Sequence, residues 1–297
     1  MDKNYQYLFS APAVVFLLVM VAFPIIYTFI LSFHSWRMST NIPWKWVGLE
    51  NYTDMFSDKR FLKAVGRTFH FTVIALTIEV FLGMVIALFL DRPFKGKNLT
   101  KTLFLLPMVA TPVAVGVVWK LIYEPNIGII NYILRLLNLK GLDWLGDGDL
   151  ALYALMVVDI WQWTPMVMLI LQAGLSSIPT DCYEAARVDG ATSFQVIQKI
   201  TLPLLKPTFF TAVLLRLVDA LKTFDIIYSM TMGGPGHDTE TMNILSYKTA
   251  FEYMQFGEAS AMLIVLSSIF FTVWPINQPS PCCVAMLLIL ARWLSIL

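Results

Sequence analysis

YLFSAPAVVFLLVMVAFPIIYTFILSF, residues 7–33, is almost entirely apolar, and no Asp, Glu, Lys or Arg occurs between Lys3 and Arg37. At about 1.5 Å of rise per residue, a helix over this run is about 40 Å long, which exceeds the thickness of a hydrocarbon layer, about 30 Å. The apolar run is too long for the about 7–15 residues of a signal-peptide core, and no small-residue cleavage site follows it. The stretch therefore predicts an uncleaved transmembrane helix.

Five further apolar blocks follow along the chain, at residues 70–90, 102–123, 150–175, 208–232 and 259–277. The whole chain is 58% hydrophobic and 14% charged, which excludes an ordinary soluble domain. Backbone polar groups within lipid must be hydrogen-bonded internally, so each block is best interpreted as a helix. The predicted fold is all-α, a polytopic membrane helical bundle with about six transmembrane helices.

The orientation of this bundle follows from the density of basic residues. Arg92, Lys95, Lys97 and Lys101 are concentrated between the second and third blocks, whereas acidic residues dilute the cations of residues 34–69. Because short cytoplasmic loops are enriched in Lys and Arg, this pattern favours a cytoplasmic position for both termini.

The polar segment 176–207, between the fourth and fifth blocks, has the pattern of a helix, a turn and a second helix. Thr180 or Asp181 is expected to cap the first helix, with Glu184 completing a capping box. Gly190 is expected to end that helix. The second helix is expected to begin after Thr192 or Ser193 and to run to Leu202, where Pro203 breaks it.

Two interpretations of this segment remain open on physical grounds. Small Ala185 and Ala186 would allow close approach of another protein, with Glu184 and Arg187 offering charged contacts at the edge. An amphipathic loop lying on lipid headgroups fits the same pattern.

A resemblance distinguishes between the two. Glu184-Ala185-Ala186, three residues, Gly190, nine residues, Ile200, one residue and Leu202-Pro203 resemble the EAA signature of binding-protein-dependent ABC permeases. The resemblance implies the type I ABC importer permease fold, with this loop seated on the ATPase subunit. The implied ATPase-coupling residues are Glu184, Ala185, Ala186, Arg187, Gly190, Ile200, Leu202 and Pro203.

A second resemblance narrows the subfamily. Residues 224–228, Gly233-Gly234-Pro235, residues 247–251 and, earlier, residues 48–52 are similar to the maltose- and glycerol-phosphate-type sugar permeases. This resemblance extends over residues 7–274. It implies a multi-pass protein of a bacterial or archaeal inner membrane that translocates a sugar or related polar solute, with membrane lipid around it and no nucleic acid. The implied partners are an ABC ATPase dimer, a second and different permease subunit, and an external solute-binding protein.

The chain has no G-x-x-x-x-G-K-[ST] phosphate loop, so separate subunits are expected to hydrolyse ATP, and no cofactor is expected in this one. An ion-coupled secondary carrier is the alternative transport function. A membrane enzyme would need a clustered nucleophile, base or metal set, and the sequence contains none. Cys182, Cys282 and Cys283 have no disulfide or metal-ligand spacing with the histidines.

Charged residues within the apolar blocks are the candidates for a translocation path. Arg216, Asp219, Lys222 and Asp225 recur every three residues, which fits either a ladder of ion pairs or a hydrated wall. Glu79 and Asp159 are single acids in the second and fourth blocks. They either serve transport or are held by a helix contact or a basic residue of the fifth block. The candidate path residues are Asp219, Lys222, Asp225, Tyr228, Asp159 and Glu79.

The sequence also suggests three divisions of the chain. Residues 1–69 form an N-terminal transmembrane helix with an outer loop, residues 70–280 a permease domain that includes the loop 176–207, and residues 281–297 an atypical tail. The apolar run from 259 to Trp274 is short for a membrane span, which makes the end of the sixth block the least regular part of the pattern.

Overall fold

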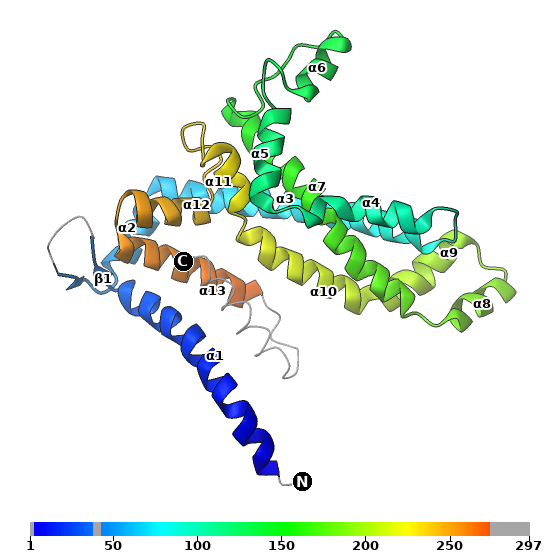
Figure 1. Cartoon of the computed structure of the whole chain (residues 1–297), viewed down its shortest axis with the longest axis horizontal. Coiled ribbons are helices and arrows are strands. Elements are labelled where there is room, and N and C mark those ends of the chain that lie inside the picture. Colours follow the sequence, from blue (N-terminus) through cyan, green and yellow to red (C-terminus); the bar gives the residue numbers. More distant parts are fainter. Residues whose placement is uncertain (1–2, 38–42, 274–297) are drawn as a thin grey trace. The chain divides into compact units, whose positions relative to one another are not determined.

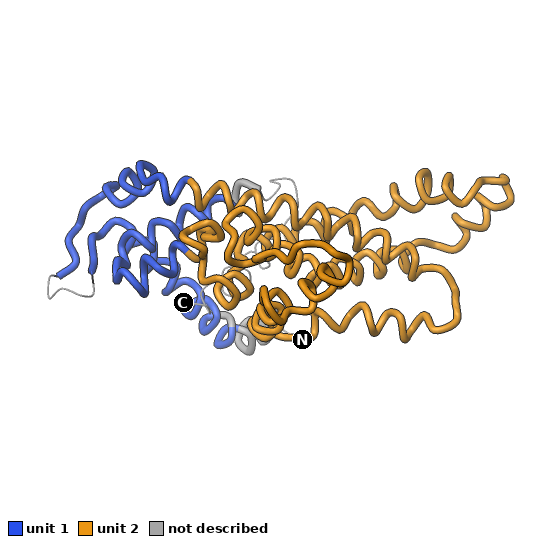
Figure 2. Tube along the Cα trace, turned by 90° about the horizontal axis from the view of Figure 1, so that it is seen from above, with its two compact units in different colours: residues 1–62, 245–297 blue, residues 63–244 orange. Residues whose placement is uncertain are grey.

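The computed structural model describes residues 3–37 and 43–273, and the described chain is predominantly helical (Figure 1). It divides into two compact units, residues 1–62 with 245–297 and residues 63–244 (Figure 2). The predicted three-part division is not tested by this clustering. The atypical tail, residues 281–297, lies outside the described residues.

The first unit contains α1 (Lys3–Leu31), α2 (Glu50–Ser57) and α13 (Phe256–Val273), with α13 packed against both of the others. A short antiparallel ribbon joins β1 (His34–Ser35) to β2 (Lys45–Trp46), with His34 opposite Trp46. Nearby, the Asn51 side chain donates to the carbonyl oxygens of Ser32 and His34 at 2.7 and 3.0 Å, which ties the start of α2 to the end of α1.

The second unit is built around α7 (Gly148–Ser176), most of whose side chains are buried. This helix contacts α4 (Lys97–Val109), α5 (Pro112–Ile122), α10 (Leu202–Leu221) and α11 (Asp225–Thr231). The remaining elements are α3 (Lys59–Asp91), which begins in the first unit, then α6 (Ile129–Leu136), α8 (Thr180–Val188), α9 (Ser193–Val196) and the π-helix η1 (Ile197–Thr201). α12 (Met242–Tyr247) begins in the second unit, which ends at Ile244, and the π-helix η2 (Lys248–Glu252) belongs to the first.

Helices occupy all six predicted blocks, but they differ in their ability to span a membrane. Among the described residues, three helices are long and apolar enough to cross a membrane: α3, α7 and the part of α1 from residue 11 to residue 31. The bent pair α4–α5 makes a fourth span if it is counted as one. α10 and α13 correspond to the fifth and sixth blocks. α13 begins at Phe256, three residues before the predicted start, and residues 274–277 of its block are outside the description.

The third block is not one straight helix. α4 and α5 meet at an angle of 95°, and the two residues between them, Ala110 and Thr111, have extended ψ angles of 143° and 140°. Pro112 is the first residue of α5. Because proline disfavours the helical conformation of the residue before it, the break falls at Thr111. Gln162 of α7 donates to the Ala110 carbonyl at 3.1 Å, replacing a helical bond lost there.

The prediction of one continuous helix over residues 208–232 is wrong. α10 starts earlier, at Leu202, and ends at Leu221, and α11 begins only at Asp225. Between them, Phe224 adopts φ −131°. Thr223 and Phe224 are weak helix formers, and Asp225 favours the N-terminal turn of a new helix, where its charge complements the helix dipole.

Candidate functional site

The loop between α7 and α10 forms the predicted helix, turn and helix. α8 is the first helix, and α9 with η1 forms the second, which continues directly into α10. Figure 1 shows α8 and α9 at one end of the second unit, beyond the ends of α3 and α7. The loop is therefore covalently joined to two long helices of the bundle.

The predicted cap of α8 is wrong. Its N-cap is Pro179, and no side chain caps it. Because the helix starts at Thr180, Glu184 is two residues too far along to reach the cap position that a capping box requires. The capping box lies instead on α9, where Thr192 accepts from the Gln195 backbone N–H and the Gln195 side chain accepts from the Thr192 backbone N–H at 2.8 Å.

Gly190 ends α8 as predicted, and the geometry gives the reason. Its φ is +73°, in the left-handed region that favours glycine. The Gly190 N–H donates to the Arg187 carbonyl at 3.1 Å, and the Ala191 N–H donates to the Ala186 carbonyl at 3.0 Å. These two bonds form a Schellman motif, which satisfies the last carbonyl groups of the helix and reverses the chain.

Pro203 does not break the second helix, contrary to the prediction. It lies in the first turn of α10, directly after η1. The Leu202 N–H bonds the carbonyl of Ile197, five residues earlier, so the turn before the proline is wider than an α-turn. This π-turn accommodates the proline ring and its missing donor within a continuous helix.

The side chains of the predicted coupling residues divide by exposure. Glu184, Ala185, Arg187, Gly190, Leu202 and Pro203 are exposed, Ile200 is half-buried, and Ala186 is buried. The two arms are also linked by a 3.4 Å hydrogen bond from the Thr201 hydroxyl to the Tyr183 hydroxyl. Ala186 and Tyr183 thus hold the loop together, while the other side chains of α8 are free to meet a partner.

The predicted coupling residues do not include two apolar side chains at the turn. Val188 is 88% exposed and Phe194 is 72% exposed, on either side of Gly190. Apolar residues flanking a glycine in a polar loop are the sequence signal that could have found them. Large exposed apolar side chains at a rigid turn are typical of a protein contact.

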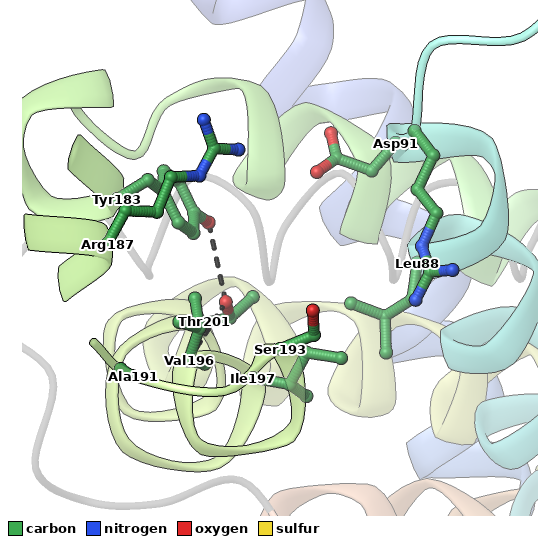
Figure 3. Close-up of a pocket in the computed structure, with 10 residues that line it drawn as sticks. Leu88, Asp91, Tyr183, Arg187, Ala191, Ser193, Val196, Ile197 and Thr201 are labelled. Carbon is green, nitrogen blue, oxygen red and sulfur yellow. Dashed lines mark hydrogen bonds between the residues drawn. The ribbon is translucent and has the colours of Figure 1, made fainter.

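A cavity of about 230 Å³ lies beneath the loop. Leu88 and Asp91 of α3, with Arg92 directly after it, line one side, and the loop contributes Tyr183, Arg187, Ala191, Ser193, Val196, Ile197 and Thr201. Figure 3 shows the side chains of Arg187 and Asp91 approaching from opposite sides of this space. The two arms of the loop and the end of α3 therefore enclose a partly polar space.

The membrane acids Glu79 and Asp159 converge on one arginine. The Arg216 Nε donates to Glu79 Oε2 at 2.6 Å, and its Nη2 donates to Glu79 Oε1 at 2.9 Å and also to Asp159 Oδ2. The Arg216 guanidinium also lies over the Trp163 ring, 5.6 Å from its centroid. Of the interpretations open for these acids, this geometry favours a basic residue of the fifth block holding both.

The other candidate path residues lie further along the fifth block. Lys222 pairs with Asp219 at 2.8 Å, so one step of the expected ladder is present, whereas Arg216 pairs across helices. Asp225 begins α11, and Tyr228 stacks on Phe224 with ring centroids 5.1 Å apart. Within residues 3–37 and 43–273, no group of three His, Cys, Asp or Glu side chains could hold a metal ion.

Comparison with known proteins identifies relatives over most of this chain. Residues 79–277 match a family described as "Binding-protein-dependent transport system inner membrane component". The "Trehalose/maltose transport system permease protein MalF" of Thermococcus litoralis is 38% identical over 86% of this chain and 85% of its own length. The "Sulfoquinovosyl glycerol transport system permease protein SmoG" of Agrobacterium fabrum is 32% identical over 89% and 86%.

Solved structures share the fold at lower identity. A chain of a bacterial ABC transporter involved in the import of alginate aligns with a TM-score of 0.80 and 21% identity, over 99% of this chain and 96% of that one. A chain of a bacterial alginate transporter in complex with a pentasaccharide-bound periplasmic protein also gives 0.80, at 20% identity and 91% coverage of both chains. The prediction of an ABC importer permease fold is thereby confirmed.

Proposed function

Because this chain belongs to the family of binding-protein-dependent transport system inner membrane components, we propose that it carries a sugar or related polar solute through the membrane, driven by ATP hydrolysis on separate subunits. Proteins of this family are transport components, in agreement with the prediction that the chain is not an enzyme. The observation that carries the proposal is the rigid, exposed loop of α8 and α9, joined directly to α7 and α10.

This loop is suited to transmit force. Its turn is fixed by the Schellman bonds at Gly190, and its arms are tied through Tyr183 and Thr201. An ATPase that binds Glu184, Ala185 and Arg187 and covers the apolar pair Val188 and Phe194 would move α8 and α9 as a unit. Because η1 runs into α10 without a gap, that movement reaches the bundle directly.

The partners follow from the same proposal. We assign the loop to an ABC ATPase dimer and the opposite side of the membrane to a solute-binding protein, with a second, different permease completing the pathway. In support, one structurally similar transporter is described in complex with a periplasmic protein. The family description itself names binding-protein dependence.

The proposed cargo is a carbohydrate or similar polar solute, since relatives are named for trehalose, maltose and sulfoquinovosyl glycerol. Within the chain, Asp219, Lys222, Asp225 and Tyr228 are proposed to line its path. They are grouped where α10 gives way to α11, and none of their side chains is fully buried. An ion-coupled carrier is disfavoured by the family assignment.

The test is co-purification of the chain with its ATPase at equal membrane expression. Glu184→Lys is expected to lower ATPase recovery sharply, because it reverses an exposed charge on α8. The matched control is Glu50→Lys, which reverses another exposed acid, in the predicted outer loop, and is expected to leave recovery unchanged. Equal recovery for both variants, or uptake that follows an ion gradient without ATP, would contradict the proposal.

A further inference from the structure

The cluster of Glu79, Arg216 and Asp159 joins the three long helices that end beside the loop. Glu79 lies on α3, Asp159 on α7 and Arg216 on α10, and their side chains are at most 1% exposed. At about 1.5 Å per residue, the cluster lies about 18–26 Å along these helices from their loop ends. It is thus distant from the loop but linked to it by three continuous helices.

An apolar core fills the space between the cluster and the loop. Buried residues of α3, α7 and α10 contribute to it, namely Ala87, Leu90, Val167, Met168, Leu171, Leu175, Leu205 and Ala212. The helix backbones approach closely in this core. A Cβ at Gly83 would lie 2.8 Å from Val167, and one at Gly174 would lie 2.7 Å from both Leu205 and Thr208. Such close packing resists sliding of one helix along another.

The charges of the cluster do not balance when all three groups are ionised. Two carboxylates and one guanidinium leave a net charge of −1 inside the bundle. Asp219 also acts electrostatically on Arg216, but it is paired with Lys222 at 2.8 Å, and that pair is neutral. Asp159 Oδ1 has no hydrogen-bond partner among the described residues. An uncompensated charge at this depth is strongly disfavoured, whereas a single proton on the carboxyl pair makes the cluster neutral.

We propose that Glu79, Arg216 and Asp159 form a neutral clamp, with one proton on the two carboxyl groups, that makes α3, α7 and α10 move as one body with the loop 176–207. This inference rests on the proposed function, because it assigns the clamp to the transmission of ATPase-driven movement. Glu79, Asp159 and Arg216 are therefore positioning residues, and they do not contact the solute.

The first test separates the proton from the charges. The variants Glu79→Gln, Asp159→Asn and the double variant are prepared in the importer reconstituted with its ATPase and binding protein. One of the two single variants replaces the carboxyl that holds the proton. That variant is expected to retain both the amount of assembled importer and the solute transported per ATP. The double variant leaves Arg216 without an anion, and it is expected to lose assembly or transport. Loss in both single variants equal to that in the double variant would overturn the neutral clamp.

The second test separates positioning from folding and from solute contact. Arg216→Lys keeps the charge but loses the planar fork that binds both acids. We expect the assembled variant to hydrolyse ATP while transporting about tenfold less solute per ATP, the effect of one weakened buried charge-assisted hydrogen bond, with an unchanged KM for the solute. Lys63→Arg, an exposed position on α3 outside the loop 176–207, is the control that should change nothing.

The outcomes distinguish the two levels of the proposal. An Arg216→Lys variant with a normal ratio of solute to ATP, or with a raised KM alone, overturns the clamp but leaves the proposed function intact. A wild-type chain that fails to stimulate or bind the ATPase overturns the proposed function itself.

Discussion

Replacement of Gly190 tests whether the backbone geometry of the loop, and not only its side chains, is needed to bind the ATPase. The φ of +73° is the perturbed quantity. A Cβ at this position meets no atom within 4 Å, so Gly190→Ala introduces no clash. The remaining penalty is that of an L-residue in the left-handed region, about 1–2 kcal/mol. That penalty corresponds to an about 5–30-fold smaller population of the folded turn relative to the open one.

A graded series sharpens the prediction. Asn tolerates the left-handed conformation better than Ala, so Gly190→Asn is expected to lie between glycine and alanine. Proline fixes φ near −65° and removes the N–H that donates to the Arg187 carbonyl at 3.1 Å, so Gly190→Pro combines two losses. The expected order of ATPase affinity is Gly, Asn, Ala and Pro, from tightest to weakest.

The assay is a titration of the purified permease variants with the ATPase, which gives a Kd for each. Gly96→Ala is the matched control, because Gly96 has a φ of +86°, also has no neighbour within 4 Å of a built Cβ, and lies outside the loop 176–207. It should reproduce any general effect of backbone strain on expression or folding. Equal affinity for glycine and alanine at position 190, or an equal loss in the Gly96 control, would refute the reasoning.

Three further predictions concern other parts of the second unit. Phe194→Ala should change the stability of the fold by no more than about 0.5 kcal/mol, because the ring is exposed, and thermal melts measure this. If the ring anchors the contact, the same variant should weaken ATPase binding by about 1–2 kcal/mol in the titration described above. Gly174→Ala should destabilise the protein by about 1–3 kcal/mol through overpacking against α10, whereas Gly66→Ala, where a Cβ meets nothing, should not; detergent-solubilised Tm values decide. The backbone N–H groups of Ile127 and Asn126 donate to the Glu124 carboxylate and hold the pKa of Glu124 below its usual range. The Ile127 amide should therefore be protected above the pKa that Glu124 has in the unfolded chain, and its protection should be lost as the pH falls through the lower pKa of the folded state. Hydrogen exchange measures this protection.

The parts of the fold that follow from local composition were predictable from the sequence. The apolar runs of α1, α3 and α7 are long enough to require helices wherever they pack, so hydropathy alone located them. The turn at Gly190 was also predictable, because a glycine at the end of a polar helix signals a C-cap. Both predictions depend on interactions within a few residues.

The errors arise where local signals compete. Thr180, Asp181 and Glu184 have the spacing of a capping box, but Pro179 takes the cap position and shifts the register. Pro203 has the properties of a helix breaker, but the π-turn before it absorbs its effect. In each case, a proline was interpreted without the turn that precedes or follows it.

The candidate path residues show the limit of a single sequence more clearly. The three-residue spacing of Arg216, Asp219, Lys222 and Asp225 suggested pairing along one helix, yet only the Lys222–Asp219 pair follows it. Arg216 instead finds partners 137 and 57 residues away, at Glu79 and Asp159. Periodicity reports which residues share a helix face, but the helix that this face meets is set by tertiary packing.

The charged cluster lies between two apolar cores of the second unit, and both broken helices pass from one core to the other. One core includes α5 and α11 with the first half of α7, and the other includes α10 with its second half. Asp159 and Gln162 of α7 lie between them, where Asp159 meets Arg216 and Gln162 bonds the free carbonyl at Ala110. Because polar groups within a bundle must be satisfied by one another, a single polar layer can support the buried charges and also the backbone freed by the break after α4. The break between α10 and α11 likewise divides the fifth block between the two cores. The clamp of Glu79, Arg216 and Asp159 lies in this polar layer. It therefore holds α3, α7 and α10 together where the third and fifth blocks pass from one core to the other.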